Sequence, residues 1–275
     1  MLAELAPVRV VELARFLHEA GVSASVMDPN ENESWSAEPV TELQACGAVV
    51  VAAVLPLLTH ADTGVRATAA AAVATWSALV DEATQASVAE HLADIPASAD
   101  RDELAARVLA LGEVESDVRE WLGHPDPAIR ACAAMFIDEP VAARELLDVL
   151  RDPAGADAWF ADRPEQFDGE VRFSLLAALL AHELPFAEVL PAALAIARVA
   201  GPWTVNLDWG LLLDEAFDPD NPPGSPSDLD EPQREFLRAL LANDQLWDPK
   251  NGNVRSALKR AGLPEFREGI VALVG

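Results

Sequence analysis

Apolar residues recur every three or four positions through much of this chain, in phase with the 3.6-residue turn of an α-helix. The clearest stripes are Val65, Ala69, Val73, Trp76 and Val80; Ile129, Cys132, Ala133, Phe136 and Ile137; and Val171, Leu175, Ala178 and Leu179. Further helices are predicted at 40–58, 84–93, 101–111, 142–150, 186–199 and 231–242. No segment alternates clearly between apolar and polar residues, so the pattern predicts an all-α protein without a significant sheet.

One repeated sequence motif, which we call the phrase, precedes several of these stripes. It reads Leu58-x-His60-x-Asp62-x-x-Val65-Arg66, and it returns as Leu122-x-His124-x-Asp126-x-x-Ile129-Arg130. A weaker copy is Asp168-x-x-Val171-Arg172, and only the Val-Arg pair recurs at 8–9 and 254–255. Repetition of a helix start indicates a stack of similar helical hairpins.

The phrase has a physical interpretation. Its Asp precedes a helix, where a carboxylate accepts from free backbone N–H groups and faces the positive end of the helix dipole. Its Arg lies one turn further on, within reach of that Asp or of the Asp in the preceding copy, and the Val or Ile enters the core. We therefore predict a structural ladder that ties adjacent hairpins together, formed by Asp62, Arg66, Asp126, Arg130, Asp168 and Arg172. His60 and His124 occupy the same turn position, which favours a turn or capping role over a metal site.

The phrase resembles HEAT-like repeats, in particular the short form of phycobilisome-lyase-type proteins. Arg130 and Arg172 are 42 positions apart, which fits the period of roughly 40–47 residues in HEAT and armadillo arrays. The resemblance implies an α-solenoid over residues 1–275, a single domain of about five to six hairpins in a right-handed superhelix. It also implies a concave face for macromolecular partners, but no chemistry. Two polar segments interrupt the pattern and are predicted as insertion loops, at about 28–39 and 218–232.

The net charge limits the choice of partners. Acidic residues number 46 against 19 basic ones, giving a formal net charge of −27, and Lys250 and Lys259 are the only lysines. Proteins that bind nucleic acids gain much of their affinity by neutralising phosphates, so direct binding of nucleic acid is disfavoured. The charge suits a basic partner, or it only keeps an apolar-rich chain in solution. Codon bias or a high-salt habitat remain open as explanations for the scarcity of lysine.

The sequence favours a cytoplasmic location. The longest uninterrupted apolar run, Ala45 to Leu58, is shorter than the roughly 18 residues typical of a membrane span. The N-terminal segment lacks the basic and apolar regions of a signal peptide. Cys46 and Cys132 lie in apolar stretches and are expected to be buried free thiols. Signatures of nucleophilic, phosphate-binding and zinc sites are missing from the sequence, so no catalytic, metal or cofactor residue is predicted.

Tryptophans outside the helical stripes are the best candidates for a binding surface. Trp35 lies in the first polar insertion, and Trp203, Asp208 and Trp209 lie in an irregular stretch. Tryptophan often carries a large part of the energy of an interface, although each of these residues could equally be structural. We expect a non-enzymatic scaffold, a monomer or weak dimer, that binds a protein or peptide on an acidic concave face. The alternatives are an immunity or inhibitor protein that mimics nucleic acid, or a HEAT-type lyase or DNA glycosylase-like enzyme around 203–209.

Overall fold

The computed structural model of the chain describes residues 7–26, 37–248 and 250–275. These residues form helices joined by turns, and no strand occurs in those ranges, so the all-α prediction is confirmed for them. The fold divides into two compact units. Unit 1 comprises residues up to Ile137 together with 159–168, and unit 2 comprises 138–158 and 169–275.

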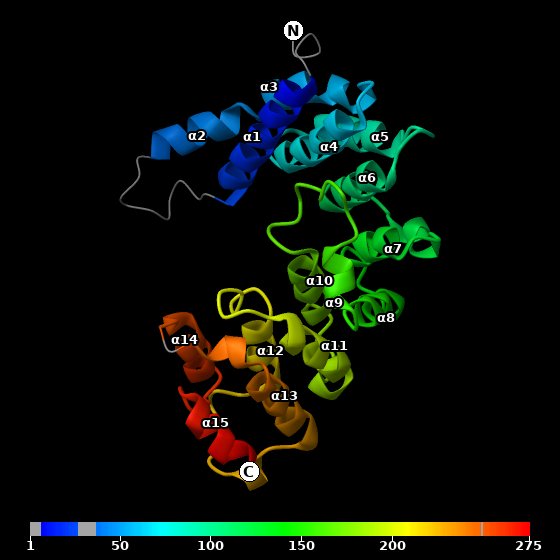
Figure 1. The fold of residues 1–275 in the computed structure, drawn as a ribbon. Helices are drawn as coiled ribbons and strands as arrows, with labels where there is room; N and C mark the ends of the chain where they lie inside the picture. Colours follow the sequence, from blue (N-terminus) through cyan, green and yellow to red (C-terminus); the bar gives the residue numbers. More distant parts are fainter. Residues whose placement is uncertain (1–6, 27–36, 249) are drawn as a thin grey trace. The chain divides into compact units, whose positions relative to one another are not determined.

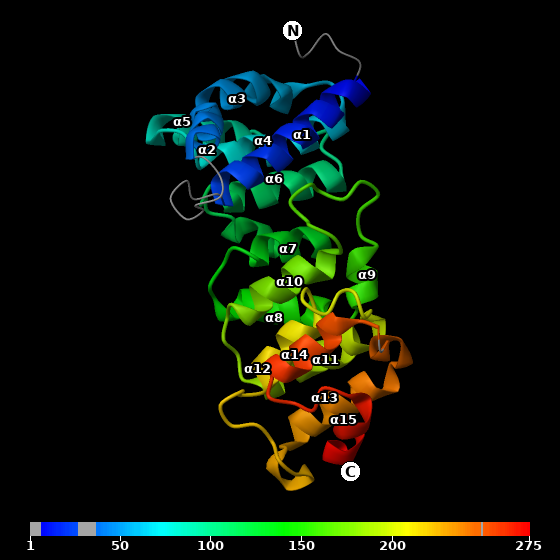
Figure 2. The same ribbon diagram turned by 90° about the vertical axis from the view of Figure 1, so that its left-hand side faces the viewer.

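Helix α4 (Thr63–Ser77) is the centre of unit 1. It contacts α1 (Pro7–Val26), α3 (Gly47–Val54), α5 (Glu82–Ala93), α6 (Arg101–Glu113) and the 3-10 helix η2 (Leu55–Thr59). The remaining elements are α2 (Ala37–Ala45), η3 (Arg119–Gly123) and α7 (Pro127–Ala134). Figure 2 shows α4, α6 and α7 following one another, in agreement with the contacts between successive members. Helix α4 is buried on nearly all sides because its alanines let four neighbouring helices approach it.

Small residues set the closest helix contacts in unit 1. A Cβ atom at Gly21 of α1 would lie 2.7 Å from Nε1 of Trp76 in α4, and that nitrogen donates to the carbonyl of Leu17 at 2.6 Å. A Cβ atom at Gly112 would lie 2.2 Å from the ring of Phe136. Glycine at these positions therefore lets the Trp76 ring approach α1 and the Phe136 ring approach α6 this closely.

The loop 159–168 belongs to unit 1, although the residues before and after it belong to unit 2. We call this loop the strap. It is the lime-green loop beside α6 in Figures 1 and 2. The rings of Phe160 and Phe167 stack with centroids 5.9 Å apart, and Phe167 is buried. The strap is thus packed through apolar contacts as well as polar ones.

One stretch of unit 1, Val40–Thr59, is long and apolar enough to cross a membrane by length and composition, and 28% of it is buried. A core helix of a soluble protein meets the same criteria, so one such stretch is weak evidence for a membrane span. The helix is also interrupted at Cys46, and it ends as a 3-10 turn that contains Pro56. Its residues Val51, Val54 and Leu58 are buried in unit 1, where α3 and η2 both contact α4.

Unit 2 contains α8 (Pro140–Val149), α9 (Pro153–Asp157), α10 (Val171–Leu180), α11 (Phe186–Val199), α12 (Trp209–Ala216), η4 (Pro226–Asp228), α13 (Glu231–Ala242), η5 (Asp244–Trp247), α14 (Gly252–Arg260) and α15 (Arg267–Val274). Helix α11 contacts α8, α9, α12 and α13, and α13 in turn contacts α15. The core of unit 2 forms along this series, with Ile196, Leu213 and Phe236 fully buried.

The two predicted insertions have different outcomes. Most of the first, 28–39, lies outside the described residues, and its last three residues begin α2. The second, 218–232, contains η4 and the first residues of α13. The solenoid arrangement, the number of hairpins, their handedness and the single domain stay predictions.

Candidate functional site

The repeated phrase forms a helix-capping turn in both of its strong copies. The Asp62 carboxylate accepts from the backbone N–H of Val65 at 3.1 Å, and Nδ1 of His60 accepts from the N–H of Asp62 at 3.0 Å. In the second copy, Asp126 accepts from Ala128 at 3.0 Å, and His124 accepts from the N–H of Asp126 at 3.2 Å. The histidines therefore hold the turn in which the capping Asp lies.

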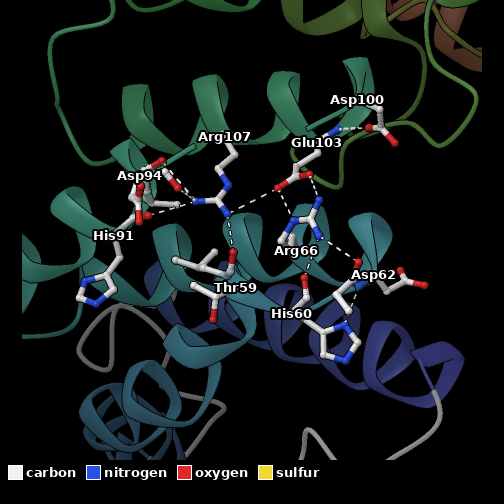
Figure 3. Close-up of polar contacts among 12 residues, drawn as sticks. Thr59, His60, Asp62, Arg66, His91, Asp94, Asp100, Glu103 and Arg107 are labelled. Carbon is white, nitrogen blue, oxygen red and sulfur yellow. Dashed lines mark hydrogen bonds and ion pairs between the residues drawn. The ribbon is translucent and has the colours of Figure 1, made fainter. Parts of the chain in front are cut away.

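Arg66, the arginine of the first copy, belongs to a buried ionic network between α4 and α6 (Figure 3). Its Nε lies 2.6 Å from Oε1 of Glu103, and its Nη2 lies 2.5 Å from Oε2. Its Nη1 donates to the carbonyls of His60 at 2.7 Å and Ala61 at 3.2 Å. Arg66 is 4% exposed and Glu103 is fully buried. The partner of this arginine is thus Glu103 of α6, and not the predicted Asp62.

Arg107 is the second cation around Glu103, one turn further along α6. It is fully buried, and its Nη2 lies 3.5 Å from the Glu103 carboxylate. It donates to the carbonyls of Leu58 at 2.5 Å and His91 at 3.0 Å. Burial lowers the pKa of Arg107, whereas the hydrogen bond that Arg66 donates to Glu103 raises the pKa of Arg66. One carboxylate between two guanidinium groups therefore joins α4, α6 and the turns beside them.

The second copy gives its arginine a more open site. Arg130 is half-buried and donates to the carbonyls of His124 at 3.0 Å and Pro125 at 3.1 Å. The Asp126 carboxylate forms an ion pair with Arg101, at 2.6 Å from its Nε. The phrase therefore places the arginine against its own turn in both strong copies.

The third copy departs from the prediction. Asp168 is exposed and does not cap α10, because the residue that precedes the helix is Glu170. Arg172 is buried and pairs with Asp157 at the end of α9. Its Nη2 also lies 3.6 Å from Oδ2 of Asp208. The predicted role of Asp168 in the ladder is thus wrong, since two carboxylates from elsewhere in unit 2 neutralise Arg172.

Asp208 and Trp209, proposed from the sequence as part of a binding surface, are both fully buried. The Asp208 carboxylate accepts from the N–H of Trp209 at 2.6 Å and from the hydroxyl of Thr204 at 2.8 Å. Burial raises the pKa of Asp208 to about 6, against the lowering effect of these hydrogen bonds and of Arg172. Their burial excludes both residues from a partner surface in this structure. Trp35 lies outside the described residues.

Trp203, by contrast, is 72% exposed. It lies in a turn between α11 and α12 that polar contacts hold from several sides. Asn251 donates to the carbonyl of Pro202 at 2.5 Å, and Nε1 of Trp209 donates to the carbonyl of Gly201 at 3.1 Å. Leu207, in the same turn, is 46% exposed. We call this segment, 200–208, the Trp203 turn. It presents a large aromatic ring to solvent from a backbone that these hydrogen bonds hold.

A groove opens in unit 1 between α1, the beginnings of α4 and α6, and the strap. Its volume is about 660 Å³. Apolar residues of α1 form part of its wall, and carboxylates of all four elements line it: Glu12, Asp62, Asp100, Asp102, Asp162 and Glu165. Glu103, Arg15 and Arg163 complete its charged lining. We call this feature the acidic groove.

The strap is fixed to the helices around the acidic groove. Arg15 of α1 holds Glu165, with Nε and Nη2 both 2.7 Å from the same carboxylate oxygen. The N–H of Asp162 donates to Asp102 of α6 at 2.8 Å. The side chain of Gln166 donates to the carbonyl of Ala106 at 3.0 Å. These contacts give the groove a defined wall.

Several residues of these sites escape sequence reasoning. Glu103 and Arg107 have the spacing of a solvent-exposed helical pair, and only the apolar residues on both sides of Arg107 indicate burial. Asp157 and the first part of the strap, 159–163, are outside any repeated pattern. Cys132 is buried, as expected, and burial raises its pKa, whereas Cys46 is exposed because it lies at the break between α2 and α3.

Comparison with protein-family models, with curated proteins and with solved structures finds no match to this chain. The resemblance to HEAT-like repeats therefore depends on the phrase itself. Among the residues that the structure describes, no three His, Cys, Asp or Glu side chains are grouped so that they could hold a metal ion.

Proposed function

We propose that the protein is a non-enzymatic interaction module, a HEAT-like α-solenoid that binds a partner protein or peptide. The observation that carries this proposal is the Trp203 turn. An exposed tryptophan on a backbone held by hydrogen bonds loses little conformational freedom when it binds, and tryptophans are frequent hot spots of protein interfaces. Leu207 and Val199, four residues from Trp203 on either side in the sequence, are 46% and 38% exposed.

The charge of the chain supports a basic partner. A formal net charge of −27 attracts cationic surfaces over distances of about a Debye length and repels phosphate backbones. We therefore place this module among proteins that act in the cytoplasm on other proteins, without direct contact to nucleic acid. It acts as a monomer or weak dimer.

An enzyme with its site around 203–209 is disfavoured by burial. Asp208 is the acidic residue of that stretch, and all its surface is covered by Thr204, Trp209, Arg172 and the surrounding helices. A carboxylate so enclosed has no access to a substrate. Mimicry of nucleic acid shares the acidic charge with the scaffold, and no separate feature of the described residues favours it.

Affinity capture from native lysate at low salt tests this proposal. We expect the full chain to retain a specific partner, and Trp203→Ala to lose it with an affinity change of about 30-fold, equivalent to roughly 2 kcal/mol. Phe266→Ala is the matched control, because Phe266 is an aromatic residue of the same unit that is 59% exposed. Retention of the same partner by the Trp203 variant would show that the turn is not its binding site.

A further inference from the structure

The acidic groove retains a strong negative charge after its internal partners are considered. Seven carboxylates line it against two arginines. Of these carboxylates, Glu103 is paired with Arg66, and Glu165 is paired with Arg15. The N-termini of α4 and α6 open into the groove, and together they contribute about one positive charge. Arg107 is a second cation beside Glu103. About two negative charges therefore remain, so the capping role of Asp62 and Asp100 does not account for the whole cluster.

The groove also has an apolar side. Pro7, Val8 and Val11 line it from α1, Ala67 lines it from α4, and Pro164 lines it from the strap. Its volume of about 660 Å³ lies within the range of 300–1,000 Å³ usual for ligand sites. An apolar wall beside carboxylates suits a side chain with an aliphatic stem and a cationic end.

One guanidinium group of the chain is already bound to a carboxylate at this groove. Arg15 extends from α1 at the edge of the groove and binds Glu165 of the strap through two nitrogens. Asp102 and Asp162 lie next to each other, since the N–H of one donates to the carboxylate of the other at 2.8 Å. Two adjacent carboxylates match the planar fork of an arginine better than the single ammonium of a lysine.

We propose that the acidic groove of unit 1 binds an arginine side chain of a flexible basic segment in a partner protein. The aliphatic stem of that arginine packs against Val8, Val11 and Ala67, and its guanidinium group lies between Asp102 and Asp162. This inference specifies the partner chemistry of the proposed interaction module and depends on that function. Its site is separate from the Trp203 turn.

A labelled peptide with two central arginines tests the groove, with fluorescence anisotropy of the full chain as the readout. We expect salt-sensitive binding that the double variant Asp102→Asn, Asp162→Asn weakens by about tenfold or more. Asparagine still accepts the hydrogen bond from the strap, so the wall of the groove is preserved. The matched control, Glu265→Gln with Glu268→Gln, removes two exposed carboxylates of unit 2 and is expected to bind as the original chain does.

A second variant separates shape from charge. Ala67→Met fills the groove without changing its charge, and methionine is well tolerated in a helix. It is expected to weaken binding of the peptide as strongly as the double variant does. The same peptide with citrulline in place of arginine is expected not to bind, because citrulline keeps the shape of arginine without its charge.

Three results would overturn the proposal. These are equal loss of binding in the groove variants and the control, equal binding of the citrulline peptide, and binding of spermidine without binding of the peptide. The first two indicate a diffuse surface effect, and the third indicates a site for a small cation. If the peptide does not bind at the groove while Trp203→Ala still loses a captured partner, the proposed interaction module is retained and only its arginine site is wrong.

Discussion

The arginine of the repeated phrase is buried in both the first and the third copy, but its surroundings differ between the two. Arg66 in α4 of unit 1 is 4% exposed, and Arg172 in α10 of unit 2 is 7% exposed. Arg66 binds a Glu that lies later in the chain, on α6, and this Glu is shared with Arg107. Arg172 binds Asp157, which lies before it in the chain, and approaches Asp208, which lies after it.

The difference between the two sites lies in the balance of charge. The network of Arg66 has two cations around one carboxylate, and that of Arg172 has one cation between two carboxylates. A buried network with a surplus cation depends strongly on its single anion, whereas one with a surplus anion responds to pH. The phrase therefore specifies where the arginine lies. The neighbouring helices decide whether the stability of its network depends mainly on one carboxylate or on pH.

The largest effect is expected from Glu103→Ala. The variant leaves Arg66 and Arg107 buried without their carboxylate, and we expect it to lower the free energy of unfolding by about 3–5 kcal/mol. Asp157→Ala in the other network should cost less, because Asp208 remains near Arg172 and the Asp157 side chain is 14% exposed. Chemical denaturation, with hydrogen exchange of α4 and α10 to locate the change, measures both.

A matched triple variant tests the cause. Replacement of Arg66 by Met, Glu103 by Leu and Arg107 by Met removes the charges together, and it should recover much of the loss. If the triple variant is as unstable as Glu103→Ala, the cost comes from packing and the charge argument is wrong.

The stability of unit 2 should depend on pH through Asp208, and this distinguishes the network of Arg172 from that of Arg66. Asp208 has a pKa of about 6 in the fold, above the ordinary value of 3.8. Its contribution to stability is therefore full below pH 3.8 and is lost as the pH rises through about 6. A shift of about two pKa units corresponds to about 3 kcal/mol. We expect exchange protection of α10 and α12 to rise as the pH falls from 7 to 5, and Asp208→Asn to remove this slope. A slope that persists in the variant would assign it to another group.

These networks also show how far the sequence predicts the molecule. The helices, the capping by Asp62 and Asp126 and the burial of the motif's Val and Ile follow from local pattern. The partners of Arg66 and Arg172 depend on which helices meet, and a chain with 46 acidic residues offers too many candidates for spacing to select Glu103 or Asp157. Trp203 and Trp209 are six residues apart in one irregular stretch, yet only the folded turn reveals that one is exposed and the other buried.

The first and third copies of the phrase should differ in how much their Asp contributes to the free energy of unfolding. Asp62→Ala removes the cap of α4 and is expected to cost about 1 kcal/mol. Asp168→Ala is expected to change the free energy of unfolding by less than about 0.5 kcal/mol, because Asp168 is exposed and does not cap α10. Denaturation of the two variants under the same conditions measures the difference. An equal cost at both positions would mean that Asp168 has a structural role in solution after all.

The residue two positions before each Asp should have a smaller effect than the cap that Asp62 forms. His60 accepts a hydrogen bond from the N–H of Asp62, whereas Gln166, at the same place in the third copy, donates to Ala106 of α6. His60→Ala should cost about 0.5–1 kcal/mol, the usual net value of one hydrogen bond, and should reduce exchange protection only at the start of α4. Gln166→Ala should leave α10 unchanged and loosen the strap. If His60→Ala instead destabilises the whole of unit 1, the turn holds more of the structure than its single hydrogen bond.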